Sequence, residues 1–306
     1  MTAPRLGLAL SSGSARGWAH IGVIRALAAH GLEPTIVTGA SVGALVGAAY
    51  ASGTLGPLED WVCRLTQLDV WRLVDATFRG GGVMTGNRLM AAVAECVTDR
   101  PIEGLPIEYG AVATDLYTGD EVWLREGSLI GAVRASSGLP GLLAPTWYQD
   151  RWLVDGGVVN PLPVSLCRAL GADVVIAVDL SRSVTRAAMR AQRNGKPAAK
   201  ASAEGAAVLQ RWSGLVDGLV ESFRSSRRDE PGLFEAMASA VNIMQERITR
   251  TRLAIEPADV VLRPDLGEFQ LMDFHRAREA IDVGYAAVES AAAQIEALQT
   301  RQPELA

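Results

Sequence analysis

Two short apolar runs near the start of the chain are each followed by small residues and then by a helical pattern. The first run, Arg5 to Leu10, leads into Ser11–Ser14, after which apolar residues recur at the spacing of one helix face. The second run, Thr35 to Thr38, is β-branched and leads through Gly39–Gly43 into a helical stretch reaching about Tyr50. We therefore expect two successive strand–turn–helix units.

The rest of the chain continues to alternate between strand-like and helical patterns. Further strands are predicted at Ile107–Thr114, Glu121–Leu124, Trp147–Val154, Asp173–Leu180 and Asp259–Leu262. Helices are predicted at Leu162–Leu170 and from Asp273 to about Thr300. This alternation favours a three-layer α/β fold, with a largely parallel central sheet flanked by helices. With no internal repeat, the prediction is a single domain over residues 1–306.

One stretch, at about residues 181–204, departs from this alternation. It is rich in Ala, Arg and Lys, and we interpret it as an inserted mobile loop or weak helix. The pattern over residues 206–252 then predicts two amphipathic helices, which form a helical excursion from the α/β alternation. Arginines recur in the insertion at intervals typical of one helix face; they are Arg182, Arg186, Arg190 and Arg193. Two hypotheses stay open for them, contact with an anionic membrane and a solvated loop.

Charge and composition narrow the possible classes. The chain has 29 basic and 34 acidic side chains, which argues against a nucleic-acid partner. Its three histidines and three cysteines show no metal-ligand spacing, so no metal or cofactor is expected. Neither a secretory signal nor a membrane span is apparent. A cytoplasmic location is expected. Peripheral contact with the inner face of the membrane is a further hypothesis.

The strongest chemical signal is Gly39-Ala40-Ser41-Val42-Gly43, a Gly-x-Ser-x-Gly turn between a predicted strand and a predicted helix. Such a turn exposes the serine hydroxyl above a helix N-terminus, whose dipole favours negative charge. Serine also needs a base, and Asp155-Gly156-Gly157 supplies an accessible carboxylate after a predicted strand. A third motif, Ser12-Gly13-Ser14-Ala15-Arg16-Gly17, can bring backbone amides to the same end of the sheet.

Together the three motifs resemble the patatin-like phospholipase family in order and approximate spacing. The resemblance extends to Ala113–Leu116, to Ala135–Pro140 and to Asp155–Pro163, and covers roughly residues 5–180. It implies a patatin fold and hydrolysis of fatty-acyl esters of phospholipids, lysophospholipids or related lipids. The catalytic dyad implied is Ser41 as nucleophile and Asp155 as base, without histidine or cofactor. It also implies an oxyanion hole near Ser12, Gly13, Ser14 and Arg16, supported by Gly39, Gly43, Gly156 and Gly157.

One residue departs from the family pattern. The loop of the family usually opens with glycine, whereas Ser11 and Ser12 precede Gly13 here. A side chain at a position that requires positive φ costs about 1 kcal/mol. Either Ser11 has an ordinary φ or the loop is altered.

Two other functions stay open at the level of sequence. An α/β-hydrolase esterase would need a Ser-His-Asp triad, for which His275 is the only late histidine. A regulatory or scaffold protein could keep the fold without catalysis. Reaction of Ser41 with a fluorophosphonate would distinguish an enzyme from a scaffold.

Overall fold

A central sheet organises the molecule. The computed structural model describes residues 4–75, 82–181 and 233–301. Five neighbouring strands are parallel, in the order β10 (Val260–Leu262), β9 (Val174–Val178), β1 (Leu6–Leu10), β2 (Ile36–Ala40) and β4 (Glu108–Asp115). Three more are antiparallel, namely β5 (Glu121–Leu124), β7 (Thr146–Tyr148) and β8 (Arg151–Asp155). The predicted α/β class with a largely parallel sheet is confirmed.

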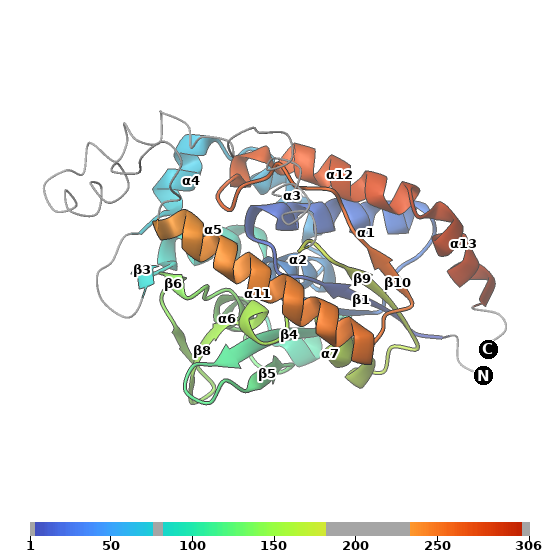
Figure 1. Cartoon of the computed structure of the whole chain (residues 1–306), viewed down its shortest axis with the longest axis horizontal. Helices are drawn as coiled ribbons and strands as arrows, with labels where there is room; N and C mark the ends of the chain where they lie inside the picture. Colours follow the sequence, from blue (N-terminus) through green and yellow to red (C-terminus); the bar gives the residue numbers. More distant parts are fainter. Residues whose placement is uncertain (1–3, 76–81, 182–232, 302–306) are drawn as a thin grey trace, which may run out of the picture.

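Helices cover both faces of this sheet. Leu6, Leu8 and Leu10 of β1 point into one core, whereas Ala9 points into the other, as the two-residue period of a strand requires. The first core is closed by α1 (Ala19–Ala29), α2 (Val42–Ala51) and α12 (Ala277–Glu289). The second is closed by α7 (Val164–Ala169) and the end of α11 (Leu233–Ile255). Figure 1 shows α1 and α12 along one side of the sheet and α7 and α11 along the other.

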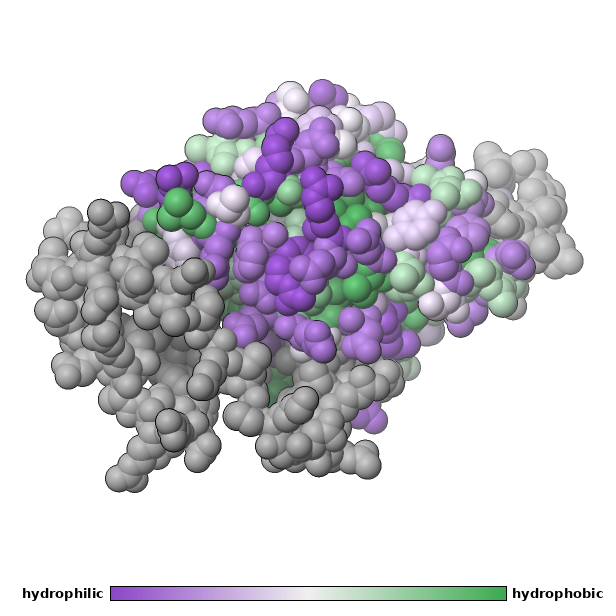
Figure 2. Space-filling model, turned by 90° about the horizontal axis from the view of Figure 1, so that it is seen from above, coloured by the Kyte–Doolittle hydropathy of each residue, from purple (hydrophilic) through white to green (hydrophobic). Residues whose placement is uncertain are grey.

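The outer helix α12 is amphipathic. Its buried residues are Ala277, Ala280, Ile281, Gly284 and Val288, which recur at helical spacing. Seen from above, the molecule presents mainly hydrophilic side chains, with apolar residues showing between them (Figure 2). The apolar stripe of α12 therefore faces α1 rather than solvent.

Two predicted elements are each divided in the structure. The strand predicted at Trp147–Val154 is a hairpin of β7 and β8, because Gln149 and Asp150 both have positive φ, 49° and 59°, as in a tight hairpin turn. The helix predicted from Asp273 is divided into η4 (Phe274–Arg276), α12 and α13 (Ala292–Arg301). At the second break the Ser290 hydroxyl donates to the Ala286 carbonyl at 2.8 Å, a bond that bends helices.

Several elements lack a clear sequence signal. They are the helices α3 (Leu55–Val62), α4 (Gln67–Leu73), α5 (Asn87–Cys96) and α6 (Leu129–Ser136), the short turns η1 (Ser14–Trp18), η2 (Ile102–Gly104) and η3 (Gly156–Val158), and a parallel pair of β3 (Gly82–Met84) and β6 (Gly141–Leu143). Most of them lie between β2 and β8. This part of the chain surrounds the pocket described below.

Some predictions fall outside the described residues. They include nearly all of the basic insertion at 181–204, with Arg182, Arg186, Arg190 and Arg193, and the first of the two helices predicted in 206–252. The second of those helices corresponds to α11, which ends at Ile255 rather than Arg252. Across the described ranges, none of the helices combines the length and apolarity needed to cross a bilayer.

Candidate active site

The ends of two strands meet along one edge of β4. Ala40, the last residue of β2, lies opposite Val112, and Asp155, the last residue of β8, lies opposite the next residue, Ala113. Because β5 pairs with the other edge of β4 over the same stretch, β2 and β8 must approach each other tip to tip. The residue after β2 is Ser41. The register of β4 thus brings the predicted nucleophile and the predicted base together.

Ser41 lies in a sharp turn between β2 and α2. Its φ of 56° and ψ of −124° are far from helical and strand values, which is the strained geometry of a nucleophile elbow. The flanking glycines make the turn possible, because a Cβ on Gly39 would lie 2.3 Å from the Gly43 backbone and one on Gly43 would lie 2.3 Å from the Leu10 carbonyl oxygen. The Gly-x-Ser-x-Gly pattern is therefore a packing requirement here.

The Ser41 hydroxyl contacts the Asp155 carboxylate directly. Ser41 Oγ donates to Asp155 Oδ2 at 2.6 Å, and the Gly157 amide donates to Asp155 Oδ1 at 2.7 Å. Asp155 is 1% exposed. Burial raises the pKa of the Asp155 carboxyl to about 6, although both hydrogen bonds act in the opposite direction. The carboxyl is therefore ionised at neutral pH and can accept a proton near that pH.

The two glycines after Asp155 leave room for backbone at one position and for polar side chains at the other. A Cβ on Gly156 would lie 2.0 Å from the Val112 carbonyl oxygen. A Cβ on Gly157 would lie 2.4 Å from the Gln245 side-chain nitrogen and 2.9 Å from Asp155 Oδ1. Without side chains at these positions, the carboxylate can turn toward Ser41.

Ser136 is a supporting residue that sequence reasoning did not assign. Its fully buried hydroxyl accepts a hydrogen bond from the Ser41 amide at 2.9 Å and donates to the Val112 carbonyl at 2.6 Å. It therefore ties the elbow to β4. The only signal was its position in the motif Ala135–Pro140, which does not specify such a role.

Ser11 and Ser12 do not strain the loop after β1. Neither has a positive φ, so the concern over Ser11 is resolved in favour of an ordinary backbone. Ser11 Oγ accepts a hydrogen bond from the Leu180 amide at 3.1 Å. The Ser12 amide donates to the Pro161 carbonyl at 2.9 Å, so that amide is already used. Ser12 lines the pocket without offering its backbone donor, contrary to the prediction of an oxyanion role for its amide.

The amides of Gly13 and Ser14 differ from that of Ser12. No acceptor within the described ranges takes either of these two hydrogens. Ser14 has a φ of 51°, and its hydroxyl donates to the Leu271 carbonyl at 2.7 Å, which fixes the turn. The Val42 amide lies at the start of α2, where first-turn amides have no acceptor within the helix. Three backbone donors are thus available beside Ser41.

Arg16 supports this loop from behind. Its Nε donates to the Gly13 carbonyl at 3.2 Å, and its Nη2 donates to Asn242 Oδ1 of α11 at 2.8 Å. A trans peptide places its carbonyl and its amide hydrogen on opposite sides. Because the Gly13 carbonyl faces Arg16, the Ser14 amide is directed away from it. Sequence reasoning did not find Asn242, since a lone polar residue on a predicted helix carries no motif.

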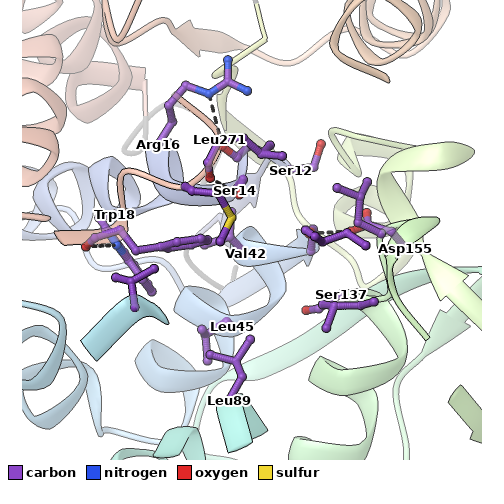
Figure 3. A pocket seen from close by; sticks show the side chains of 18 of the residues that line it. Ser12, Ser14, Arg16, Trp18, Val42, Leu45, Leu89, Ser137, Asp155 and Leu271 are labelled. Atoms are coloured by element: carbon purple, nitrogen blue, oxygen red, sulfur yellow. Dashed lines mark hydrogen bonds between the residues drawn. The ribbon is translucent and has the colours of Figure 1, made fainter. Parts of the chain in front are cut away.

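The elbow and the loop border one mainly apolar pocket of about 140 Å³ (Figure 3). Its apolar lining comes from several elements and includes Trp18, Leu45, Trp61, Leu65, Val70, Leu73 and Leu89. Arg16 and Asp155 are the two ionisable side chains that line it in the described part of the chain. In the same part, no cluster of three or more His, Cys, Asp or Glu could hold a metal ion.

Neither His20 nor His275 is the hydrogen-bond partner of the Ser41 hydroxyl. Burial lowers the pKa of His20 to about 4, so its ring is neutral, and its Nε2 lies 2.8 Å from the Ser11 carbonyl oxygen. His275 lies in η4, whereas the bond from Ser41 Oγ goes to a carboxylate. The place that a triad would give to an imidazole is therefore taken by Asp155.

Comparison with known proteins relates the chain to one family. The model of a family described as patatin-like phospholipase matches residues 8–168. The "Uncharacterized NTE family protein Mb1092c" of Mycobacterium bovis is 35% identical, over 93% of this chain and 90% of its own length. "Lysophospholipase NTE1" of Pyricularia oryzae is 29% identical, over 92% of this chain and 18% of its own.

Among solved structures, that of VipD from Legionella pneumophila aligns with 97% of this chain and 80% of its own, with a TM-score of 0.36 and 13% sequence identity. The family model covers more than half of the chain, and the mycobacterial relative matches it over nearly its full length. The chain belongs to the patatin-like phospholipase family, a family of lipid hydrolases.

Proposed function

We propose that the chain hydrolyses fatty-acyl esters of phospholipids or lysophospholipids through a Ser41–Asp155 dyad and an acyl-enzyme. The observation that carries the proposal is the 2.6 Å hydrogen bond from Ser41 Oγ to Asp155 Oδ2 inside an apolar pocket. A serine hydroxyl is barely ionised at neutral pH, so it requires such a base. The name of the fungal relative, a lysophospholipase, is consistent with this substrate class.

In the first half of the reaction, Ser41 Oγ attacks the acyl carbonyl carbon as its proton passes to Asp155 Oδ2. The negative charge that develops on the carbonyl oxygen is stabilised by the amides of Gly13, Ser14 and Val42. The tetrahedral intermediate formed by this attack then collapses. The ester bond breaks, and the departing alkoxide takes the proton from Asp155. The product is an alcohol, and the acyl group remains on Ser41.

In the second half, water attacks the acyl-enzyme. Asp155 accepts a proton from that water and returns it to Ser41 Oγ as the fatty acid leaves. The apolar lining, which includes Trp18, Leu45 and Leu89, suits an acyl chain, because burying apolar area contributes about 25 cal/mol per Å². The site thus combines an activated hydroxyl, preorganised amides and an apolar wall.

Labelling with a fluorophosphonate tests the nucleophile. The wild type should be labelled at Ser41, Ser41→Ala should not be labelled, and Asp155→Ala should be labelled much more slowly. Ser290→Ala, on an exposed turn, is the matched control and should label like the wild type. A folded wild type that resists labelling would favour the scaffold alternative.

Hydrolysis of a substrate panel tests the reaction itself. Phospholipid, lysophospholipid, monoacylglycerol and short p-nitrophenyl esters are compared for release of acid. Ser41→Ala should lower turnover by ~1,000-fold or more, as removal of a nucleophile does in other serine hydrolases. Equal turnover by Ser41→Ala and wild type would exclude the proposed mechanism.

A further inference from the structure

Two polar side chains of the pocket have no hydrogen-bond partner among the described residues. They are the Ser12 hydroxyl and the Gln245 side-chain amide of α11, in residues that are 4% and 7% exposed. Both line the pocket, so both can be reached from it. Buried polar groups are nearly always hydrogen-bonded, and an ordered water or a ligand supplies the bond where the protein does not. The two side chains therefore indicate a polar occupant of the pocket.

The same two side chains meet at the Asp155 carboxylate. A Cβ on Gly157 would lie 2.4 Å from Gln245 Nε2, 2.9 Å from Ser12 Oγ and 2.9 Å from Asp155 Oδ1. The three atoms thus surround one point, and a side chain at Gly157 would displace them. A buried water typically makes two to four hydrogen bonds, and this group of three polar atoms offers that number beside the proposed base.

The second half of the proposed reaction requires a water beside Asp155. Once Ser41 Oγ carries the acyl group, it has no hydrogen to donate, so Asp155 Oδ2 loses the bond that it accepts in the free enzyme. The acyl chain would lie along the apolar wall that includes Leu45 and Leu89, and Figure 3 shows these two residues apart from Ser12 and Asp155. The polar end of the pocket therefore stays available to water during this step.

The three polar groups match the bonding capacity of one attacking water. A water has two hydrogens and two lone pairs, and one lone pair must stay free for the attack. Asp155 can accept the first hydrogen, Ser12 Oγ can accept the second, and Gln245 Nε2 can donate to one lone pair. We propose that Ser12 and Gln245 bind the water that hydrolyses the acyl-enzyme and orient it beside Asp155. This inference rests on the proposed function.

The hydrolytic step balances without another reactant. The water oxygen bonds to the acyl carbonyl carbon as its first proton passes to Asp155. The tetrahedral intermediate then releases Ser41 Oγ, which takes that proton back. The second hydrogen of the water, which Ser12 Oγ accepted, leaves with the fatty acid. Acylation uses no water, so the loss of this water site should slow deacylation alone.

Gln245→Met tests the donor, because methionine has a similar length but no amide. The enzyme is mixed with excess p-nitrophenyl butyrate, and samples are quenched in acid. Mass spectrometry gives the ratio of acylated to free enzyme, and nitrophenol release gives the turnover. Together they yield the acylation and deacylation rate constants, whichever step limits turnover. Deacylation should slow about threefold to tenfold, the value of one hydrogen bond, and acylation by less than about twofold.

Thr249→Val is the matched control. Thr249 lies one turn further along the buried face of α11, and its hydroxyl is buried without a partner in the described part of the chain. It does not line the pocket, so both rate constants should match those of the wild type. An unchanged deacylation rate in Gln245→Met, or an equal fall in both rates, would overturn the inference. A wild type that forms no acyl group on Ser41 would overturn the proposed function as well.

Methanol distinguishes the binding of a water from a general effect on the fold. It has one hydrogen to donate, and it carries a methyl group where water has its second hydrogen. Ser12→Ala removes the acceptor of that second hydrogen and leaves room for the methyl group. The ratio of methyl ester to free acid formed from the butyryl-enzyme should therefore rise by about threefold or more over the wild type. A ratio equal to that of the wild type would show that Ser12 does not contact the attacking water.

Discussion

Asp155 is an ordinary carboxylic acid held away from water. Its side chain is almost fully buried, and two donors, the Ser41 hydroxyl and the Gly157 amide, only partly compensate for the lost hydration. Burial consequently raises the pKa of this carboxyl to about 6. The pH dependence of both activity and stability follows from this one property.

Activity should fall as the pH drops through about 6, because a protonated Asp155 cannot accept the proton of Ser41. Below that value, kcat/KM should decrease about tenfold per pH unit. The measurement is a profile from pH 4.5 to 8 with a neutral ester, so that ionisation of the substrate does not contribute. Activity that stays constant down to pH 4.5 would contradict Asp155 as the base.

The free energy of unfolding should depend on Asp155 in the opposite sense, because folding favours the protonated carboxyl whereas activity requires the ionised one. The folded-state pKa is raised from 3.8 to about 6, so the contribution of Asp155 to stability is present below about 4 and is lost as the pH rises through about 6. Asp155→Asn removes this ionisation. It should increase the free energy of unfolding by up to about 3 kcal/mol at pH 8 and by little at pH 4.

Urea denaturation of the wild type and of Asp155→Asn at pH 8 and pH 4 measures this difference in the free energy of unfolding. Ser41→Ala serves as the control, because it alters the same hydrogen bond but leaves the carboxyl able to ionise. If Asp155→Asn were less stable than the wild type at pH 8, the buried carboxylate would be stabilised by contacts that an amide cannot replace.

At the scale of elements, α1 and α12 pack at backbone contact distance. A Cβ on Gly284 of α12 would lie 2.0 Å from the Ala19 carbonyl oxygen, and one on Gly22 of α1 would lie 1.9 Å from the Ile281 carbonyl oxygen. Neither neighbour is a flexible side chain that could move aside. The two glycines therefore determine how closely the helices approach.

Gly284→Ala should thus lower the free energy of unfolding by about 3 kcal/mol, since the helices must separate to admit the methyl group. Gly56→Ala is the matched control. Its Cβ would meet nothing within 4 Å, and this glycine lies in α3. Alanine there should change the free energy of unfolding by less than about 1 kcal/mol, because the gain in helix propensity is opposed by the preference against helical backbone before Pro57. Thermal and urea unfolding distinguish the two results, and equal effects would contradict the close packing.

The success of sequence reasoning also depended on the element. The elbow at Ser41 was predictable because its constraints are local: a strand, a turn of small residues and a helix follow one another within residues 36–51. The hairpin at Gln149 and Asp150 was not, because the turn contains no glycine and glutamine is not typical of positive φ. Asn242 escaped prediction for another reason: its partner Arg16 is distant in sequence and no motif links them.

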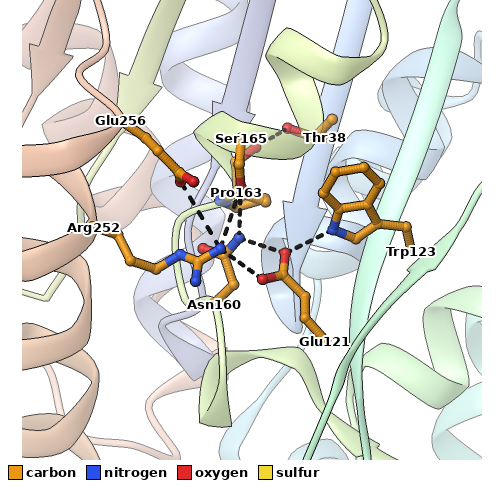
Figure 4. Close-up of polar contacts among 8 residues, drawn as sticks. All are labelled: Thr38, Glu121, Trp123, Asn160, Pro163, Ser165, Arg252 and Glu256. Atoms are coloured by element: carbon orange, nitrogen blue, oxygen red, sulfur yellow. Dashed lines mark hydrogen bonds and ion pairs between the residues drawn. The ribbon is translucent and has the colours of Figure 1, made fainter.

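At the scale of the whole molecule, α11 runs past the site and is fixed at its far end. Arg252 Nη2 donates to Glu121 Oε2 at 2.6 Å, and Glu121 also accepts from Asn160 and from the Trp123 ring (Figure 4). Nearer the site, Asn242 contacts Arg16 and Gln245 packs against Gly157. The polar cluster around Glu121 therefore helps to hold the helix whose Asn242 contacts Arg16, beside the loop after β1.

Arg252→Met should lower the free energy of unfolding by about 1–3 kcal/mol, because it leaves a partly buried carboxylate without its cation. It should also accelerate hydrogen exchange along α11 and reduce kcat/KM several-fold. Arg247→Met, at an exposed position of the same helix, is the control. Activity and exchange that match the wild type would show that α11 is held by its other contacts.

The tip-to-tip meeting of β2 and β8 has a consequence for how the protein tolerates change. Among the described residues, β4 contributes none to the pocket wall, yet Val112 and Ala113 set the separation of the two strand ends. One residue added to β4 would leave every reactive group intact and shift the ends by about 3.3 Å. An insertion in this inner strand should therefore abolish hydrolytic activity as completely as loss of Ser41.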